Sequence, residues 1–285
     1  MLPFESDNRA AIATRFSTEF SLAKSLIDIA HTVPAAVASS NPYTQRLRLL
    51  VAGIVTCEVR RYRCTLATLE LGYAENAAVL GRALYEGLLA ERFVLRSPTT
   101  PWEPGDLRLQ LAQMSPDRRA MIYCSFVTVL QKKWHYERIA KTEDVDVILG
   151  PEWRQKTALW AADVEKHIGR EWVERPKGVS KSHYSGLSIE KLAEYCDLSE
   201  THRKYYPILC ASAHANDGLR FVEMSDDSAT FHFGGSDKNF TLTFVAITSL
   251  FAMLLADVSS EFGLGLEDTL ASFALGLNLL QSELA

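Results

Sequence analysis

Residues 77–90 read AAVLGRALYEGLLA, a stretch that predicts a helix covered on two sides. One face of the helical wheel carries Leu80, Leu84 and Leu88, and the nearly opposite face carries Val79, Leu89 and Phe93. A helix that is apolar on both sides is packed against other elements on both sides. The stretch therefore predicts an all-α core built around this helix.

Two charges interrupt this apolar stretch, Arg82 and Glu86, one helical turn apart. Their i,i+4 spacing places them on the face of Val79 and Leu89, so we expect them to pair in or beside the core. Removing one partner of a buried ion pair costs on the order of 3–5 kcal/mol. Two interpretations stay open: a structural ion pair between helices, or part of a polar cluster lining a cleft, because buried ionisable groups are enriched at functional sites.

Working outward from this stretch, helical periodicity and breakers indicate a series of further helices. They are expected at about 7–31, 43–71, 73–97, 106–141 with an interruption near Ser115-Pro116, 151–171, 188–195, 200–215, 240–260 and 266–284. Gly72 separates two of them into a helical hairpin. The segments 219–224 and 229–233 flank a turn-like SDDS and predict a β-hairpin. The prediction is an all-α helical bundle, residues 1–285 as a single domain, with one small β-hairpin near 219–233.

Composition excludes several classes of protein. The net charge is −5, with 30 Lys+Arg against 35 Asp+Glu, which disfavours a broad nucleic-acid or membrane patch but allows a local basic cleft. The five cysteines include no C-x-x-C pair, so neither a disulfide framework nor a zinc knuckle is indicated. Cys57 and Cys64 are expected to be buried, as free cysteines usually are.

The N-terminus carries early charges and no apolar core, so no signal peptide is indicated. Residues 240–256 carry no charge and approach the length that spans a bilayer. Their threonines and serine favour a buried helix, or a helix at a subunit interface, over a membrane span. We therefore expect a cytoplasmic protein that does not enter the membrane.

A second cluster lies at residues 205–216, where Tyr206, Cys210 and His214 fall on one helical stripe. His214 would lie in the last turn, where the helix dipole favours a protonated imidazole. It is either a hydrogen-bonded structural residue or a catalytic one. No pair of histidines has metal-ligand spacing and no glycine-rich phosphate loop occurs, so neither a metal nor a cofactor is expected.

The two clusters and the segment GLSIEKLA between them resemble an uncharacterised bacterial helical family that is similar to the HEPN proteins, the higher eukaryote and prokaryote nucleotide-binding helical domains. That pattern has an Arg-x-x-x-Glu helix, here Arg82 and Glu86. It also has a Tyr helix ending in Ser-x-x-x-His, here with Cys210 in place of the serine and His214. The resemblance covers about 40–216, leaving the hairpin and two apolar helices of 217–285 outside it.

The resemblance implies a metal-independent ribonuclease of a bacterial defence or toxin–antitoxin system, with RNA as partner. His214 would act as general acid or base, Arg82 would hold phosphate, and Glu86 would orient one of them. The Arg-x(4–6)-His motif of HEPN ribonucleases is absent from the sequence. The alternative is a non-catalytic module that senses a ligand or binds a protein partner. The apolar helices in 240–284 predict a homodimer.

Overall fold

The chain is seen in a computed structural model. It describes residues 3–96, 98, 100–133, 137, 150, 152–174, 179, 183–211, 222–225, 228–231 and 239–282. The fold divides into two compact units, residues 1–91 with 200–285, and residues 92–199. Each unit is described by itself below, and the single domain expected for residues 1–285 stays a prediction.

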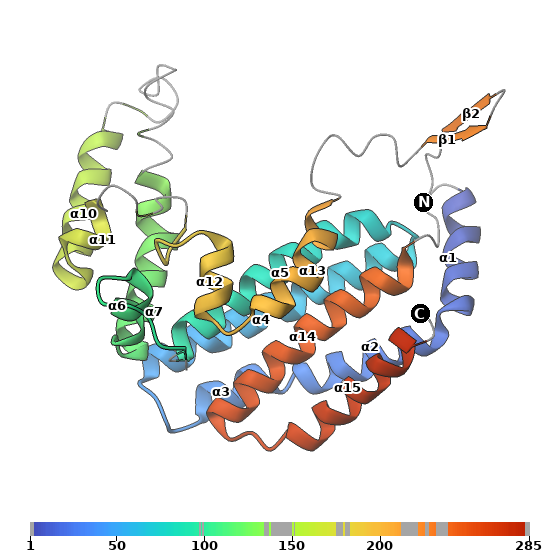
Figure 1. Cartoon of the computed structure of the whole chain (residues 1–285), viewed down its shortest axis with the longest axis horizontal. Helices are drawn as coiled ribbons and strands as arrows, with labels where there is room; N and C mark the ends of the chain where they lie inside the picture. Colours follow the sequence, from blue (N-terminus) through green and yellow to red (C-terminus); the bar gives the residue numbers. More distant parts are fainter. Residues whose placement is uncertain are drawn as a thin grey trace. The chain divides into compact units, whose positions relative to one another are not determined.

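The first unit is a bundle of long helices. Its helices are α1 (Pro3–Arg15), α2 (Ser17–Ala30), α3 (Val33–Ser39), α4 (Gln45–Glu70), the greater part of α5 (Ala74–Leu95), α13 (Ser199–Ala211), α14 (Phe240–Phe262) and α15 (Glu267–Ser282). Figure 1 shows α14 lying along α4, and α14 also packs against α2, α3 and α15. The helical content of the described residues confirms the all-α class.

Two short strands follow α13 in the chain. They are β1 (Val222–Ser225) and β2 (Ser228–Phe231), which pair antiparallel with Val222 opposite Phe231 and Ser225 opposite Ser228. They fall in the segment where turn chemistry indicated a hairpin. They are the only strands among the described residues, so they add one small ribbon to a helical fold.

The α4–α5 hairpin forms because its ends are marked in the sequence. Thr44 caps α4 by accepting a hydrogen bond from the Leu47 backbone N–H at 3.3 Å. At the other end Gly72 has φ of 82°, a left-handed conformation that glycine adopts without strain, and its N–H donates to the Leu69 carbonyl at 2.8 Å. The break predicted at Gly72 is confirmed.

The core of the first unit is centred on α14. The Tyr62 ring of α4 stacks on Phe251 with centroids 4.4 Å apart, and its hydroxyl lies 2.9 Å from Thr248 Oγ1. By length and composition alone, α14 could cross a membrane, and it is the one such helix among the described residues. Because 67% of its most apolar window is buried, α14 is compatible with the core helix of a soluble protein.

Close approach of three helices requires glycine at position 81. A Cβ at Gly81 would lie 2.9 Å from Leu209 Cδ2 of α13, and closer still to Ile247 Cγ2 of α14. We therefore expect Gly81→Ala to lower the free energy of unfolding by about 1–2 kcal/mol, because overpacking outweighs the gain in helix propensity. Urea unfolding measures this change.

A matched control for Gly81→Ala is Gly53→Ala on α4, where an added Cβ would meet no atom within 4 Å. That variant should gain about 0.5–1 kcal/mol, because alanine loses less backbone entropy than glycine in a helix. Equal stabilisation of both variants would contradict the close packing of α5 against α13 and α14.

The second unit is made of shorter helices. They are α6 (Leu107–Ala112), α7 (Pro116–Ser125), the π-helix η1 (Phe126–Leu130), α10 (Trp153–Ile168), α11 (Arg170–Glu174) and α12 (Ile189–Tyr195). Ser115 caps α7 and Ser188 caps α12, each accepting from a backbone N–H three residues on. The interruption near Ser115-Pro116 and the cap at Ser188 are therefore confirmed.

Three burial predictions are wrong. Cys57 and Cys64 are exposed on α4 instead of buried. Val79 is 40% exposed, although Leu89 and Phe93, which were expected on the same face of α5, are fully buried. In all three cases the side chain lies on a part of the α4 or α5 surface that no neighbouring element of the described chain covers.

Candidate functional site

The Arg82–Glu86 pair of α5 forms as the spacing predicts. The Arg82 Nε–H donates to Glu86 Oε1 at 3.2 Å. Their side chains are 34% and 45% exposed, so of the two positions expected, in the core or beside it, the pair lies beside it. The pair lies at the edge of the core, where a soluble molecule can reach it.

Helix α13 brings an aromatic side chain to this pair. The Arg82 guanidinium lies over the Tyr206 ring, with Cζ 5.6 Å from the ring centroid. This cation–π geometry holds the guanidinium in place while leaving part of it in solvent. Arg82 and Tyr206 belong to two clusters that are far apart in the sequence, and the structure brings this member of the second cluster to the first.

His202 joins the same surface one turn before Tyr206. Its ring stacks on Tyr206 with centroids 4.5 Å apart and planes at 21°. Its Nδ1 lies 3.0 Å from the hydroxyl of Tyr85, which is buried on α5. Sequence reasoning did not single out His202, although extending the stripe of Tyr206 and Cys210 back by four residues reaches it.

The local environment fixes the protonation states of this surface. Partial burial and then the adjacent Cys210 raise the pKa of Tyr206 to about 12, so its hydroxyl is neutral at pH 7. Desolvation opposes the charge on Arg82, but Tyr206, Cys210 and Glu86 together raise the pKa of its guanidinium. The surface therefore presents a permanent cation beside a neutral phenol and a carboxyl group.

A second ion pair lies on α4 beside the first. Arg61 Nη1 donates to Glu58 Oε1 and also to the Ala83 carbonyl of α5, the latter at 3.3 Å. Glu58 is only 1% exposed, and its Oε2 has no hydrogen-bond partner. Gly87 of α5 makes room for this carboxyl group, because a Cβ there would overlap Glu58 Oε1. Sequence reasoning missed Glu58 and Arg61.

His214 lies outside the described residues, so its expected position near Arg82 and Glu86 stays a prediction. Of the three residues proposed for catalysis, the structure brings Arg82 and Glu86 together. In the part of the chain that is described, no group of three or more His, Cys, Asp or Glu side chains has an arrangement that could hold a metal ion.

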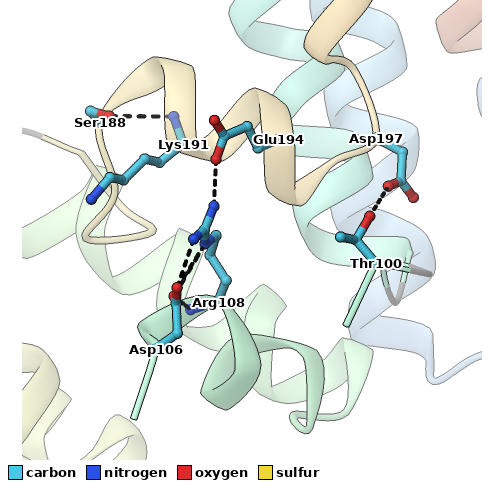
Figure 2. Close-up of polar contacts among 7 residues, drawn as sticks. All are labelled: Thr100, Asp106, Arg108, Ser188, Lys191, Glu194 and Asp197. Atoms are coloured by element: carbon cyan, nitrogen blue, oxygen red, sulfur yellow. Dashed lines mark hydrogen bonds and ion pairs between the residues drawn. The ribbon is translucent and has the colours of Figure 1, made fainter. Parts of the chain in front are cut away.

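The second unit has a pocket of about 540 Å³ at the starts of α6 and α12. It is lined by Asp106, Leu107, Val179, Gly186, Leu187, Ser188 and Lys191. Figure 2 shows Asp106, which precedes α6, and Lys191 of α12, with the Arg108 side chain lying between Asp106 and Glu194. A volume of this size is typical of pockets that hold small ligands.

Ion pairs organise the wall of this pocket. Arg108 Nη2 lies 2.7 Å from Asp106 Oδ2, and Arg108 Nη1 donates to Glu194 (Figure 2). The hydrogen bonds that Arg108 donates to Asp106 lower the pKa of Asp106, and the charge of Lys191 adds to the effect. The charged side chains that line the pocket are therefore Asp106 and Lys191, and Arg108 behind them pairs with both Asp106 and Glu194.

A family model, described as a family of unknown function (DUF5677), matches residues 59–229. The match spans Arg82, Glu86 and Tyr206 in the first unit and all the pocket-lining residues of the second. No curated protein and no solved structure matches the chain. The chemistry of the site therefore has to follow from its own residues.

Proposed function

The chain belongs to DUF5677, a family of unknown function, and we propose that it is a HEPN-like helical protein that cleaves RNA without a metal ion. The observation that supports this proposal is the partly open surface where α5 and α13 hold Arg82 between Glu86 and Tyr206. A guanidinium is the side chain best suited to a phosphate, because its planar fork matches two phosphate oxygens.

The proposed reaction uses the RNA 2′-hydroxyl as nucleophile. A histidine, which we assign as His214, takes the 2′-OH proton while the 2′-oxygen attacks the adjacent phosphorus. The bond from phosphorus to the 5′-oxygen breaks, that oxygen takes a proton from water, and the protonated histidine returns its proton to solvent, giving a 2′,3′-cyclic phosphate and a 5′-hydroxyl. Arg82 stabilises the charge that develops on the phosphate oxygens, and Glu86 orients Arg82.

The setting we propose is the bacterial cytoplasm, in a defence or toxin–antitoxin system. We also propose a homodimer through α14 and α15, which expose Leu242 at 43% and Leu275 at 64%. Apolar side chains of this exposure at an interface are covered in a dimer. Light scattering at micromolar concentration should give twice the chain mass, and a monomeric mass would contradict the dimer.

Cleavage of RNA in the presence of EDTA tests the proposed activity. We expect wild type to cleave, Arg82→Met to lose about 10²–10³ in rate, and His214→Ala about 10²–10⁴. The matched control is Arg203→Met, an exposed arginine of α13, which should change the rate less than about twofold. Products should end in a 2′,3′-cyclic phosphate. Absence of cleavage by wild type, or equal rates for all variants, contradicts the proposal.

The pocket of the second unit supports a second candidate function, a non-catalytic module that senses a small ligand or binds a partner. Lys191 provides a cation at an opening that Leu107 and Leu187 also line. Ligand-observed NMR should show saturation transfer from wild type to the probe benzoate, and this transfer should weaken in Lys191→Met. Lys166→Met, which alters an exposed lysine of α10, is the control. No transfer, or equal transfer with both variants, contradicts this function.

A further inference from the structure

The two ion pairs of the first unit form one electrostatic network. Glu58 and Arg61 come from α4, and Arg82 and Glu86 come from α5. We propose that the carboxyl group of Glu58 is a proton switch that controls how strongly the Arg82 surface binds an RNA phosphate. This inference rests on the RNA binding proposed above and concerns its regulation.

The environment of the Glu58 carboxyl group disfavours its ionised form. It is buried against Gly87 of α5, and Arg61 satisfies its Oε1 while Oε2 has no hydrogen-bond partner. A buried carboxylate oxygen without a donor is costly, because it loses its hydration without replacement. Protonation removes this cost, so the neutral acid competes with the ionised form at this position.

The charges around Glu58 act on its pKa in opposite directions. Burial raises its pKa to about 7, Arg61 on its own helix opposes this, and Glu86 on α5 adds to it. Glu86 is in turn paired with Arg82. Glu58 therefore changes charge near neutral pH beside Arg61 and Arg82, whose charges stay, since arginines remain protonated in proteins.

Protonation of Glu58 changes the net charge that a bound anion meets at the Arg82 surface. With Glu58 ionised, two carboxylates balance two guanidinium groups. With Glu58 protonated, the network carries one net positive charge beside Arg82, which attracts a phosphate. By linkage, a bound phosphate must also favour protonation of Glu58 by the same factor. RNA binding should therefore strengthen as the pH falls through about 7.

The test uses fluorescence anisotropy with a labelled, uncleavable 2′-O-methyl RNA oligonucleotide at pH 6 and pH 8, at constant ionic strength. We expect wild type to bind roughly three- to tenfold tighter at pH 6, as one added charge near a phosphate predicts. Glu58→Gln should bind with similar affinity at both pH values, near the wild-type affinity at pH 6. Arg82→Met should bind weakly at both.

Histidines also titrate in this range, so the effect of pH has to be assigned to Glu58. A control variant shows whether the effect is specific to that carboxyl group. Glu70→Gln changes another carboxyl of α4, which is a third exposed and paired with Arg9. It should keep the wild-type ratio of affinities between pH 6 and pH 8. If Glu58→Gln also keeps that ratio, the switch is overturned.

Carbon-13 NMR of the glutamate side chains reports on Glu58 without RNA. A carboxyl resonance that titrates near pH 7 in wild type and is missing from Glu58→Gln supports the proton switch. If no glutamate titrates between pH 6 and 8, the switch is overturned whether or not RNA binds. If Glu58 titrates there but wild type binds no RNA at either pH, the RNA-binding part of the proposal is overturned.

Discussion

Arg119→Met should lower the free energy of unfolding of the unit formed by residues 92–199 by about 3–5 kcal/mol. The Arg119 guanidinium is fully buried. It donates to two backbone carbonyls at the end of α5, those of Val94 and Leu95, each at 3.3 Å. It also donates to the carbonyl of Leu111 in α6 and to that of Met114, just after α6 ends. Methionine keeps most of the volume but removes the guanidinium donor from these carbonyls, of which Leu111 keeps the backbone N–H of Met114 at 3.1 Å.

Urea unfolding followed by tryptophan fluorescence measures this effect, because Trp102, Trp153 and Trp172 lie in the same unit. The matched control is Arg170→Met, which removes an exposed arginine whose partner Glu174 is also exposed. Such surface pairs contribute at most about 1 kcal/mol. A loss for Arg119→Met no larger than that of Arg170→Met would show that Arg119 does not hold the two helix ends.

Stability should fall as the pH rises through the titration of Glu58. Its pKa is about 7 in the folded chain and 4.5 for an unperturbed glutamate, so the folded state binds the proton more tightly than the unfolded state. The resulting stabilisation is fully present below the pKa of the unfolded state and is lost as the pH rises through the folded-state pKa of about 7. Relative to Glu58→Gln, wild type should lose on the order of 3 kcal/mol between pH 4.5 and pH 8.

Urea unfolding of wild type and Glu58→Gln at several pH values isolates this contribution, because other titrating groups cancel in the difference between them. Glu70→Gln serves as the control, and its difference from wild type should stay nearly constant above pH 5. If the wild-type and Glu58→Gln curves run parallel from pH 4.5 to pH 8, Glu58 does not titrate as its burial indicates.

Local signals in the sequence predicted several helix ends, although the break between α1 and α2 and the separate helix α3 were missed. Gly72, Ser115-Pro116 and Ser188 mark helix ends through backbone chemistry that acts within a few residues, and each appears where it was expected. The Arg82–Glu86 pair also follows from local spacing, because residues four apart on a helix are neighbours. Such features need no knowledge of the rest of the fold.

Burial and long-range pairing could not be predicted in the same way. Glu58 stands beside arginines in CEVRRYRC and reads as a solvated residue. Its burial depends on Gly87, which is far along the chain and lets α5 approach α4. The contact of Arg82 with Tyr206 likewise depends on how α13 lies on α5. A helical wheel shows which faces of a helix are apolar, but the packing of the neighbouring helices determines which of those faces are buried.

The two exposed cysteines of α4 have a practical consequence. Cys57 precedes Glu58, and Cys64 lies seven residues further along the same helix, about 10 Å away. A thiol-reactive fluorophore attached at Cys57 would therefore lie next to the Glu58–Arg61 pair, and its emission would report charge changes there. The same accessibility makes intermolecular oxidation a route to covalent dimers, so purification under reducing conditions keeps a disulfide from imitating the helix-mediated assembly.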